Sequence, residues 1–360
     1  MRIAFLGDGS LNHTKRWVEY FHQHEHEVLL ISFEQVSGCP FPVHQLRKRL
    51  PTKLLGYLAA LRSVRSELTS FRPHLVNALY VGGYGLIGAL SGIRPLVISS
   101  LGSDLLVDYP SSVIHRIQIR YAIGKADLIT TDGENLSNMV VAMGVPRERI
   151  LKAYFGIDEH LFHPPSDSHR PDDSKGGEVR IVSTRHLYKI YNIDLLIDSA
   201  PAILEKVNAT FTICGDGPER TRLERKAATL GVSDRFIFRG TLDPSAIAGE
   251  LQGASVYVST SRSDSTSVSL LEAMACGVPP VVTDIPANRE WIQDGKNGFL
   301  VPLNDPQALA EAVITVIKDR NFSRSVREEN LIVVIERGRW RSNMAHVEKA
   351  FYELIAAAAR

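Results

Sequence analysis

The segment from residue 256 to 282, VYVSTSRSDSTSVSLLEAMACGVPPVV, constrains the fold of this chain more than any other. Its first residues, Val256 to Ser259, are apolar and β-branched for the most part, which predicts a buried strand. A serine-rich turn follows, and from Val268 onward the sequence predicts a helix of about ten residues that ends at Gly277. Because the start of a helix presents unpaired backbone N–H groups, the strand, loop and helix together predict a site for an anion the size of phosphate.

Two carboxylates flank this predicted anion site, Asp264 in the loop and Glu272 within the helix. An ionised carboxylate accepts hydrogen bonds from two vicinal hydroxyls at once, and a nucleotide sugar offers such hydroxyls on its ribose and its hexose. The plainer alternative is a capped helix whose acid is solvated. The pair of acids therefore indicates a nucleotide-sugar site if the rest of the segment agrees with one.

The two acids lie eight positions apart and precede the run Ala-Met-Ala-x-Gly-x-Pro, which starts at Ala273. This arrangement resembles the paired-acid signature of family 4 retaining glycosyltransferases. In that family the second acid binds the ribose hydroxyls, and Glu272 matches it. Asp264 stands where the family usually has glutamate, so its reach toward the donor sugar is one methylene shorter.

The resemblance implies the GT-B fold, an α/β architecture of two Rossmann-like domains whose parallel sheets face a central cleft. A chain of 360 residues exceeds what one hydrophobic core usually organises, which agrees with two domains. Residues 163 to 177 are rich in Pro, Ser and Asp and predict a linker. We expect an acceptor domain at residues 1–163, joined by a returning C-terminal helix near 342–360, and a nucleotide-sugar-binding domain at residues 164–341.

The composition bears on the class of protein. A net charge of +1 gives no sign of a nucleic-acid partner, and the three cysteines, far apart in the sequence, indicate a reducing compartment without a disulfide framework. The apolar run at the N-terminus breaks at Gly7, too early for a signal peptide or a membrane span. The cysteines and the short N-terminal run lead us to expect a cytoplasmic protein. No His/Cys cluster has the spacing of metal ligands, so we expect no metal or other cofactor.

The chain opens with a strand, a glycine-containing loop, a helix and a second strand, the βαβ order of a Rossmann-like domain. Glu34 falls near the ribose-binding position of dinucleotide-binding folds, but Asn12 stands where their third glycine belongs, which disfavours a nicotinamide enzyme. In the glycosyltransferase interpretation this loop faces the cleft. Gly9, Ser10 and His13 are then candidate contacts for the acceptor, with an ordinary surface histidine as the alternative for the last.

Farther along, the run SSLGSDLL resembles a family segment at the acceptor side of the cleft. Gly102 and Asp104 agree with the family, and Asp104 is expected at the carboxyl end of a strand, where open α/β sheets bind ligands. Two positions depart from the family pattern, Asn77 and Leu101. A third resemblance, Phe-Gly-Ile-Asp from residue 155 to 158, corresponds to the turn that closes the first domain.

The second α/β unit starts with VRIVSTR, and Arg185 ends that strand. We expect Arg185 to bind the diphosphate, because its planar guanidinium offers two donors to two phosphate oxygens. Lys189 is a further candidate from the other side of the turn. Gly215, and Gly240 with Thr241, resemble family positions at which the backbone approaches the nucleotide.

The residues that open the predicted helix, Ser267, Val268 and Ser269, add backbone amides to the donor site. The resemblance implies electrostatic chemistry, in which these amides and Arg185 stabilise the leaving diphosphate. It also implies that the acceptor hydroxyl attacks from the leaving-group face and gives its proton to a phosphate oxygen. Arg185 and Asp264 are the candidate catalytic residues.

The implied reaction moves a hexose from a nucleotide sugar, with UDP-hexose such as UDP-glucose as the default, to a saccharide or lipid-linked acceptor in polysaccharide or glycolipid biosynthesis. The alternative is a non-catalytic relative that binds a nucleotide sugar or assists another transferase. Four departures from the family pattern keep this alternative open: Asp264, Leu101, Asn77, and Tyr191, which stands where the family has a lysine.

Residues 44 to 72 are unusually basic, and leucine and valine recur there at helical spacing. A basic amphipathic helix at about 53–68 fits a peripheral contact with the inner face of the plasma membrane. It fits equally a helix that packs on its own sheet and leaves its basic face to solvent. The cations are Arg47, Lys48, Arg49, Lys53, Arg62, Arg65 and Arg72.

Overall fold

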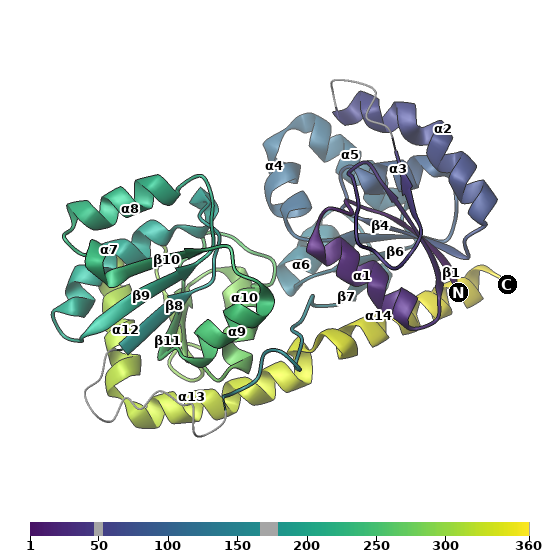
Figure 1. The fold of residues 1–360 in the computed structure, drawn as a ribbon. Helices are drawn as coiled ribbons and strands as arrows, with labels where there is room; N and C mark the ends of the chain where they lie inside the picture. Colours follow the sequence, from purple (N-terminus) through teal and green to yellow (C-terminus); the bar gives the residue numbers. More distant parts are fainter. Residues whose placement is uncertain (47–52, 166–178, 360) are drawn as a thin grey trace. The chain divides into compact units, whose positions relative to one another are not determined.

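The structure, a computed structural model, describes residues 1–46, 53–165 and 179–359 of the chain. It divides into two compact units, unit 1 with Met1–Tyr154 and Ser342–Arg360 and unit 2 with Phe155–Arg341 (Figure 1). Some predicted features lie outside the described residues. These are Arg47, Lys48, Arg49, the side chains of Lys53, Leu54 and Leu58, and most of the predicted linker.

The boundary between the units falls at Phe155, ahead of the predicted linker. The reason is a pairing that ties the residues after Phe155 to the end of unit 2. Ile157 N–H donates to the Gly338 carbonyl at 2.7 Å, and Trp340 N–H donates to the Ile157 carbonyl at 3.0 Å. The C-terminal part, from Ser342 on, belongs to unit 1.

Unit 1 is built on a seven-stranded parallel sheet with the order β3-β2-β1-β4-β5-β6-β7. Most of its strands are apolar runs buried on both faces, as parallel strands require, while the edge strands β3 and β7 are partly exposed. The strands are β1 (Arg2–Leu6), β2 (Glu27–Ser32), β3 (Val43–Gln45), β4 (Leu75–Leu79), β5 (Leu96–Ser100), β6 (Leu128–Thr131) and β7 (Ile150–Lys152). Within this sheet, β1 aligns Ile3 with Val28 of β2 on one side and with Leu75 of β4 on the other.

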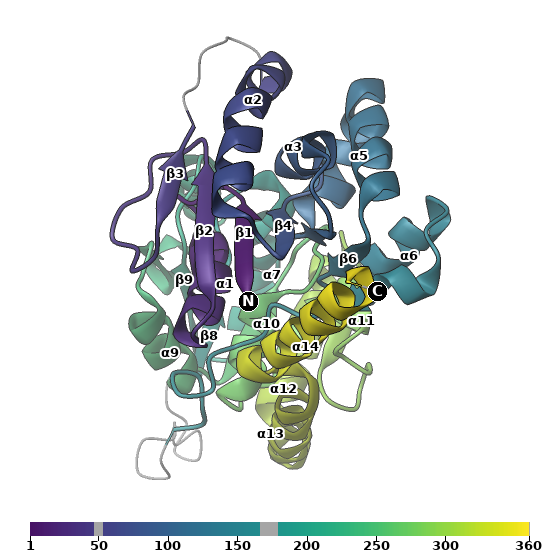
Figure 2. The same ribbon diagram turned by 90° about the vertical axis from the view of Figure 1, so that its right-hand side faces the viewer.

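The helices of unit 1 cover its sheet. They are α1 (Asn12–Gln23), α2 (Lys53–Phe71), α3 (Tyr84–Ser91), α4 (Tyr109–Ser111), α5 (Val113–Lys125), α6 (Glu134–Ala142) and α14 (Trp340–Ala358), with a π-helix at Asp104–Asp108 and a 3-10 helix at Arg147–Arg149. Figure 2 shows α2, α3 and α5 in a row over the sheet. The last helix, α14, packs against α1, where the ring of Phe351 stacks on that of Phe21 at a centroid distance of 5.3 Å.

Unit 2 has a six-stranded parallel sheet with the order β10-β9-β8-β11-β12-β13. The strands are β8 (Val179–Ser183), β9 (Ala209–Cys214), β10 (Phe236–Gly240), β11 (Val256–Ser259), β12 (Pro280–Thr283) and β13 (Phe299–Val301). The helices are α7 (Ile193–Leu204), α8 (Arg220–Thr229), α9 (Pro244–Gln252), α10 (Val268–Ala275), α11 (Pro286–Arg289), α12 (Pro306–Lys318) and α13 (Arg320–Val333). Shorter turns are 3-10 helices at Lys189–Tyr191 and Ser233–Arg235 and a π-helix at Val334–Gly338.

The predicted strand at Val256–Ser259 and the helix start at Val268 are both present, as β11 and α10. The helix is eight residues long. It ends early because Gly277 adopts a left-handed φ of 72° that a helix cannot continue through.

The basic helix of the sequence is α2, and its apolar side packs in the core of unit 1. Val64 is 0% exposed, Leu68 1% and Ala60 8%. On the other side, Arg62 is exposed, and Arg65 donates to the carbonyls of Leu90 and Ser91 in α3. These contacts favour the second interpretation, a packed helix with a solvated basic face. Across the described ranges, no helix is long and apolar enough to cross a membrane.

Candidate functional site

The strand order of unit 2 points to one place for a ligand. The first strand, β8, has β9 on one side and β11 on the other, so chain connections leave it in opposite directions. In open parallel sheets, ligands bind outside the carboxyl ends of the strands at such a switch point. Arg185 follows β8 and Asp264 follows β11, so the two candidate catalytic residues flank this switch point.

Arg185 is the centre of the polar cluster there. Its Nη1 donates to Ser267 Oγ at 3.0 Å and to Ser269 Oγ at 2.8 Å, and its Nη2 donates to the Asp264 carboxylate at 2.5 Å. The residue is only 9% exposed. The structure therefore brings together four residues that the sequence assigned separately to catalysis and to donor binding.

Two tyrosines complete the surroundings of the guanidinium. The Cζ atom of Arg185 lies 4.2 Å from the centre of the Tyr191 ring, in a cation–π contact. The hydroxyl of Tyr257, buried in β11, donates to Ser269 Oγ at 2.9 Å and so positions one of the two serines that Arg185 binds. Sequence reasoning noted Tyr191 only as a departure and missed Tyr257. The available signal for Tyr257 was its position: a tyrosine in a strand predicted to be buried needs a hydrogen-bond partner for its hydroxyl.

Arg185 stays protonated in this setting. Burial lowers the pKa of its guanidinium, but the Asp264 carboxylate together with Tyr257 and Tyr191 more than offsets burial, so the pKa lies above its ordinary value. Its Nε and the hydroxyl of Ser183 are buried atoms without a hydrogen-bond partner among the described residues. A buried donor normally has a partner, so Arg185 Nε is an exception within this cluster.

The start of α10 faces the same cluster. Ser267 caps the helix, since its Oγ accepts from the backbone N–H of Leu270. Ser265 and Thr266 in the preceding turn are buried too. Glu272, half-buried, lies in the second turn of α10, on the helix that this cap begins.

Close backbone packing holds the loop that carries Arg185. A Cβ added to Gly215 would meet the Arg185 carbonyl oxygen at 2.4 Å, so this approach requires glycine. Gly215 also forms a bridge with Gly240, which is buried. Thr241 and Lys189 are exposed, Lys189 in the short 3-10 helix after β8. The structure records no contact between Lys189 and Arg185.

The unit 1 candidates lie at the carboxyl ends of that sheet. The backbone N–H of Gly9 donates to Ser32 Oγ at 3.0 Å, and the side chain of Ser10 donates to the Asp8 carboxylate at 2.6 Å. His13 is exposed at the beginning of α1. These contacts tie the first loop to β2 and leave His13 at the surface.

Asp104 has a different setting, since it is 0% exposed. Its carboxylate accepts from the backbone N–H groups of Val81, Gly102 and Leu105 at 3.0 to 3.1 Å, and from Ser100 Oγ at 2.8 Å. Burial raises the pKa of this carboxyl, against the effect of those donors. Contact with an acceptor stays a prediction. Through these hydrogen bonds Asp104 connects the loop after β4 to the loop after β5.

The departure at Asn77 also has a structural part. Its Oδ1 accepts from the indole N–H of Trp17 at 3.1 Å, and its Nδ2 donates to Ser99 Oγ at 2.9 Å, all inside unit 1.

As for metals, the residues that the structure describes contain no group of three or more His, Cys, Asp or Glu side chains arranged to hold an ion.

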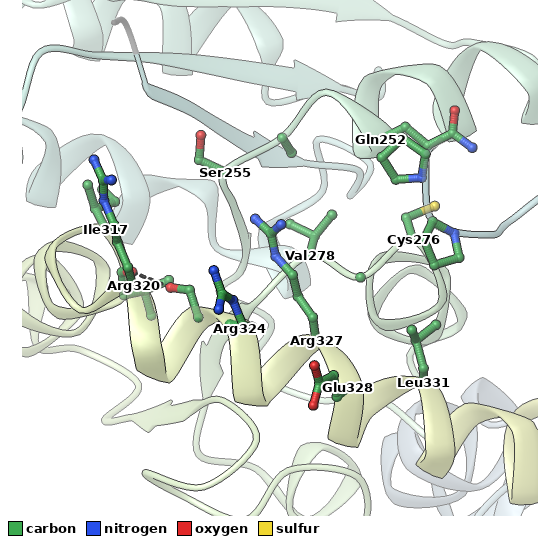
Figure 3. A pocket seen from close by; sticks show the side chains of 16 residues that line it. Gln252, Ser255, Cys276, Val278, Ile317, Arg320, Arg324, Arg327, Glu328 and Leu331 are labelled. Atoms are coloured by element: carbon green, nitrogen blue, oxygen red, sulfur yellow. Dashed lines mark hydrogen bonds between the residues drawn. The ribbon is translucent and has the colours of Figure 1, made fainter. Parts of the chain in front are cut away.

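A cavity of about 320 Å³ lies elsewhere in unit 2, at the amino-terminal side of β11 and β12 (Figure 3). Arg320, Arg324 and Arg327 project into it from one face of α13. Cys276 lines it as well, and burial raises the pKa of that thiol to about 12. Because Cys276 follows the end of α10, this cavity is separated from the Arg185 cluster by the helix, about 12 Å for its eight residues.

Comparison with known proteins agrees with this geometry. Residues 166–353 match the family described as glycosyl transferases group 1, and residues 2–133 match the glycosyl transferase 4-like family. The chain is 26% identical over 339 residues to N-acetyl-alpha-D-glucosaminyl L-malate synthase of Bacillus anthracis, which covers 93% of this chain and 84% of the relative. It is 28% identical over 340 residues to a GDP-mannose-dependent alpha-(1-6)-phosphatidylinositol dimannoside mannosyltransferase of Mycobacterium tuberculosis, covering 87% of this chain and 85% of the relative.

Solved structures resemble the whole chain. HepE of Anabaena, in complex with UDP-glucose, superposes with a TM-score of 0.82 at 20% identity and covers 98% of this chain and 100% of its own. Sucrose-phosphate synthase of Thermosynechococcus elongatus superposes with a TM-score of 0.84 at 16% identity, covering 99% and 100%. The predicted fold class, GT-B with a parallel sheet in each of two α/β units, is confirmed.

Proposed function

We infer the finer reaction from one premise, that this chain belongs to the glycosyl transferases group 1 and transfers a sugar from a nucleotide sugar. The reaction we propose is retaining: a hexose moves to a saccharide or lipid-linked acceptor, with the anomeric configuration of the donor kept. It takes place in the cytoplasm, where the three free cysteines stay reduced.

One observation carries this proposal, the Arg185 cluster at the start of α10. A charged guanidinium, two serine hydroxyls and the first amides of a helix converge at the switch point of the unit 2 sheet. All of these groups stabilise negative charge. In the transfer, negative charge develops on the diphosphate as its bond to the sugar breaks, so the cluster stabilises the transition state more than the bound donor.

The proposed step needs no separate side-chain base. The bond between the anomeric carbon and the diphosphate oxygen breaks, and the acceptor oxygen bonds to the same face of that carbon. The acceptor proton passes to the departing phosphate oxygen. Arg185 has the donor for that phosphate, since its buried Nε has no partner among the described residues.

The remaining donor contacts follow the paired acids. Glu272 binds the ribose hydroxyls, one turn into α10 from the diphosphate. Asp264, which holds Arg185 Nη2 at 2.5 Å, positions the guanidinium and reaches toward the hexose. Val268 contributes its amide at the start of α10, and Gly215, Gly240 and Thr241 bring the backbone to the nucleotide.

The donor we propose is a UDP-hexose such as UDP-glucose. Support comes from HepE, whose complex with UDP-glucose has the same fold over nearly the whole chain. The competing donor is GDP-mannose, which the mycobacterial relative uses according to its name. The base is therefore the first property to measure.

The test is a transfer assay with a panel of donors: UDP-glucose, UDP-N-acetylglucosamine, UDP-galactose and GDP-mannose. Release of the free nucleoside diphosphate (UDP or GDP) is measured for each donor, with and without a lipid or saccharide acceptor. We expect turnover with one UDP-sugar and none with GDP-mannose. Turnover confined to GDP-mannose would contradict the donor assignment. Binding of every donor without turnover would contradict the catalytic role of the Arg185 cluster.

A further inference from the structure

Helix α5 of unit 1 exposes an unusual amount of apolar surface. Val113 is 66% exposed, Ile114 59%, Ile117 65% and Tyr121 40%. We call these four side chains the α5 stripe. Val107, in the π-helix just before, adds a further apolar side chain that is 52% exposed. Exposed apolar side chains grouped in this way mark an interaction surface, whereas single ones are ordinary.

The stripe is one continuous face of the helix. A helix turns by about 100° per residue, so residues 113, 114, 117 and 121 all lie along one side of α5. The opposite side of α5 is the ordinary core face, where Ile119 and Ala122 are 0% exposed and Ile123 is 2% exposed. The helix therefore has two apolar faces and needs only one of them to fold.

Cations border the stripe on both sides. Arg116 and Arg120 lie along one edge and Lys125 along the other, and all three are exposed. Lys125 stands over the ring of Tyr121 with its Nζ 5.8 Å from the ring centre. The sequence of α5, VIHRIQIRYAIGK, contains no acidic residue. Its outward surface is thus apolar in the middle and positive at the edges.

We propose that the α5 stripe docks on an anionic lipid surface. The branched side chains enter the boundary between headgroups and acyl chains, and the flanking cations pair with lipid phosphates at the level of the headgroups. A second copy of this chain fits less well, because it would bring the same cations against each other. The inference concerns the surface at which the enzyme works and stands independently of the donor and acceptor proposed above.

The comparison with α2 sharpens the assignment. Helix α2 has cations of its own, but its apolar residues Val64 and Leu68 are consumed by the core. A helix that offers charge alone gains only a salt-sensitive attraction. Helix α5 offers both charge and apolar insertion, so it is the helix of the two that anchors the protein.

The experiment is co-sedimentation of the full chain with vesicles of phosphatidylcholine, with or without phosphatidylglycerol, in the absence of any sugar donor. One variant, Ile114→Ser with Ile117→Ser, removes the middle of the stripe. A second, Arg120→Gln with Lys125→Gln, removes two bordering charges. The matched control, Arg62→Gln with Arg72→Gln, removes two exposed charges at α2. Thermal unfolding of each variant checks that the fold is kept.

We expect binding of the wild type to vesicles that contain phosphatidylglycerol. The Arg120 and Lys125 variant should lower partition about 25-fold, since each basic side chain at such a surface changes it roughly fivefold. The serine variant should lower partition roughly tenfold or more. Partition of the control variant should stay within about threefold of the wild type, because α2 is not expected to reach the headgroups.

The variant Ile117→Trp supplies a direct measurement when its fluorescence is compared with that of the wild type, which has three tryptophans of its own. Its fluorescence should shift to shorter wavelength on addition of anionic vesicles if that side chain enters the membrane. Failure of the wild type to bind, or full binding by the serine variant, would overturn the proposal. So would a loss in the α2 control equal to that in the α5 variants, or self-association without vesicles that the serine variant abolishes. Because no donor is present, none of these results bears on the transfer reaction.

Discussion

The carboxyl ends of the two sheets carry similar residue types in opposite arrangements. In unit 1, Asp104 is fully buried and its oxygens are taken by backbone N–H groups and one hydroxyl. In unit 2, Asp264 and two serines surround Arg185, which keeps a buried donor without a partner among the described residues. In the first arrangement each carboxylate oxygen has donors, whereas in the second one buried donor has no partner among the described residues.

We propose that this difference separates residues that hold a loop from residues that bind a substrate, although both follow a strand in the same kind of fold. A carboxylate whose lone pairs are all occupied stabilises its own loops and has little left to offer a ligand. A cation with a donor that no acceptor occupies can bind another anion. Four substitutions test the contrast.

The largest effect is expected at Arg185. Arg185→Ala should lower kcat roughly a hundred- to a thousandfold, because it removes a donor to charge that develops in the transition state. The donor dissociation constant should change far less. Arg225→Ala, at an exposed arginine of α8, is the matched control and should leave both unchanged. Equal losses in kcat/KM and donor binding, with kcat kept, would reduce Arg185 to an anchor.

Asp104 should show its effect in stability. Asp104→Asn keeps the shape but replaces one acceptor oxygen with an NH₂ group, so buried N–H groups lose their partner at a cost of about 3 kcal/mol. Denaturant unfolding measures the loss, and Asp127→Asn, at the more exposed pair with Arg94, should cost less. Activity per folded molecule should survive. A higher KM for the acceptor, with stability unchanged, would instead place Asp104 in contact with the acceptor.

Glu272→Ala should weaken nucleotide binding roughly tenfold to a hundredfold, since hydrogen bonds to a charged acceptor are worth about 1.5 to 3 kcal/mol. Titration of UDP by calorimetry measures it, and the melting temperature should stay near that of the wild type. A deoxyribose nucleotide that lacks one ribose hydroxyl should lose affinity for the wild type and not for the variant. Unchanged affinity in Glu272→Ala would remove the paired-acid assignment.

The smallest effect belongs to the cap of α10. Ser267→Ala removes the acceptor for Leu270 N–H and should cost about 1 kcal/mol of stability. It also removes one of the two hydroxyls that Arg185 Nη1 binds, so kcat should fall by a smaller factor than in Arg185→Ala. Ser265→Ala, in the same turn but without that contact, separates the two contributions. A loss of stability with kcat unchanged would mean that Ser267 only caps the helix.

Much of unit 2 could be predicted from the sequence because its signals are local. The strand at Val256–Ser259 and the helix start at Val268 follow from a β-branched run and a serine cap within a few residues. The proximity of Arg185 to Asp264 could be expected only from the resemblance to a known family. Their direct ion pair depends on the order of strands across the sheet.

Other features depend on packing that no local pattern reveals. Tyr191 lies at the end of a short 3-10 helix with its ring centre 4.2 Å from Arg185 Cζ, and it is followed by Asn192, whose φ of 48° is rare for a residue with a side chain. The complete burial of Asp104 depends on backbone groups from two separate loops. The α5 stripe escaped prediction because an apolar side chain on a helix is ordinarily taken for a core residue.

Unit 2 is inserted into the sequence of unit 1, and its two ends lie side by side where Ile157 pairs with Arg339. During translation, unit 2 is therefore completed before unit 1. Most of unit 1 is synthesised first but lacks α14, whose Val347 and Phe351 are 0% exposed and whose Glu348 accepts from Tyr20 and His26. Domains usually fold in the order of their synthesis. We therefore expect unit 1 to complete its fold after unit 2, once α14 covers the apolar surface against which Val347 and Phe351 pack.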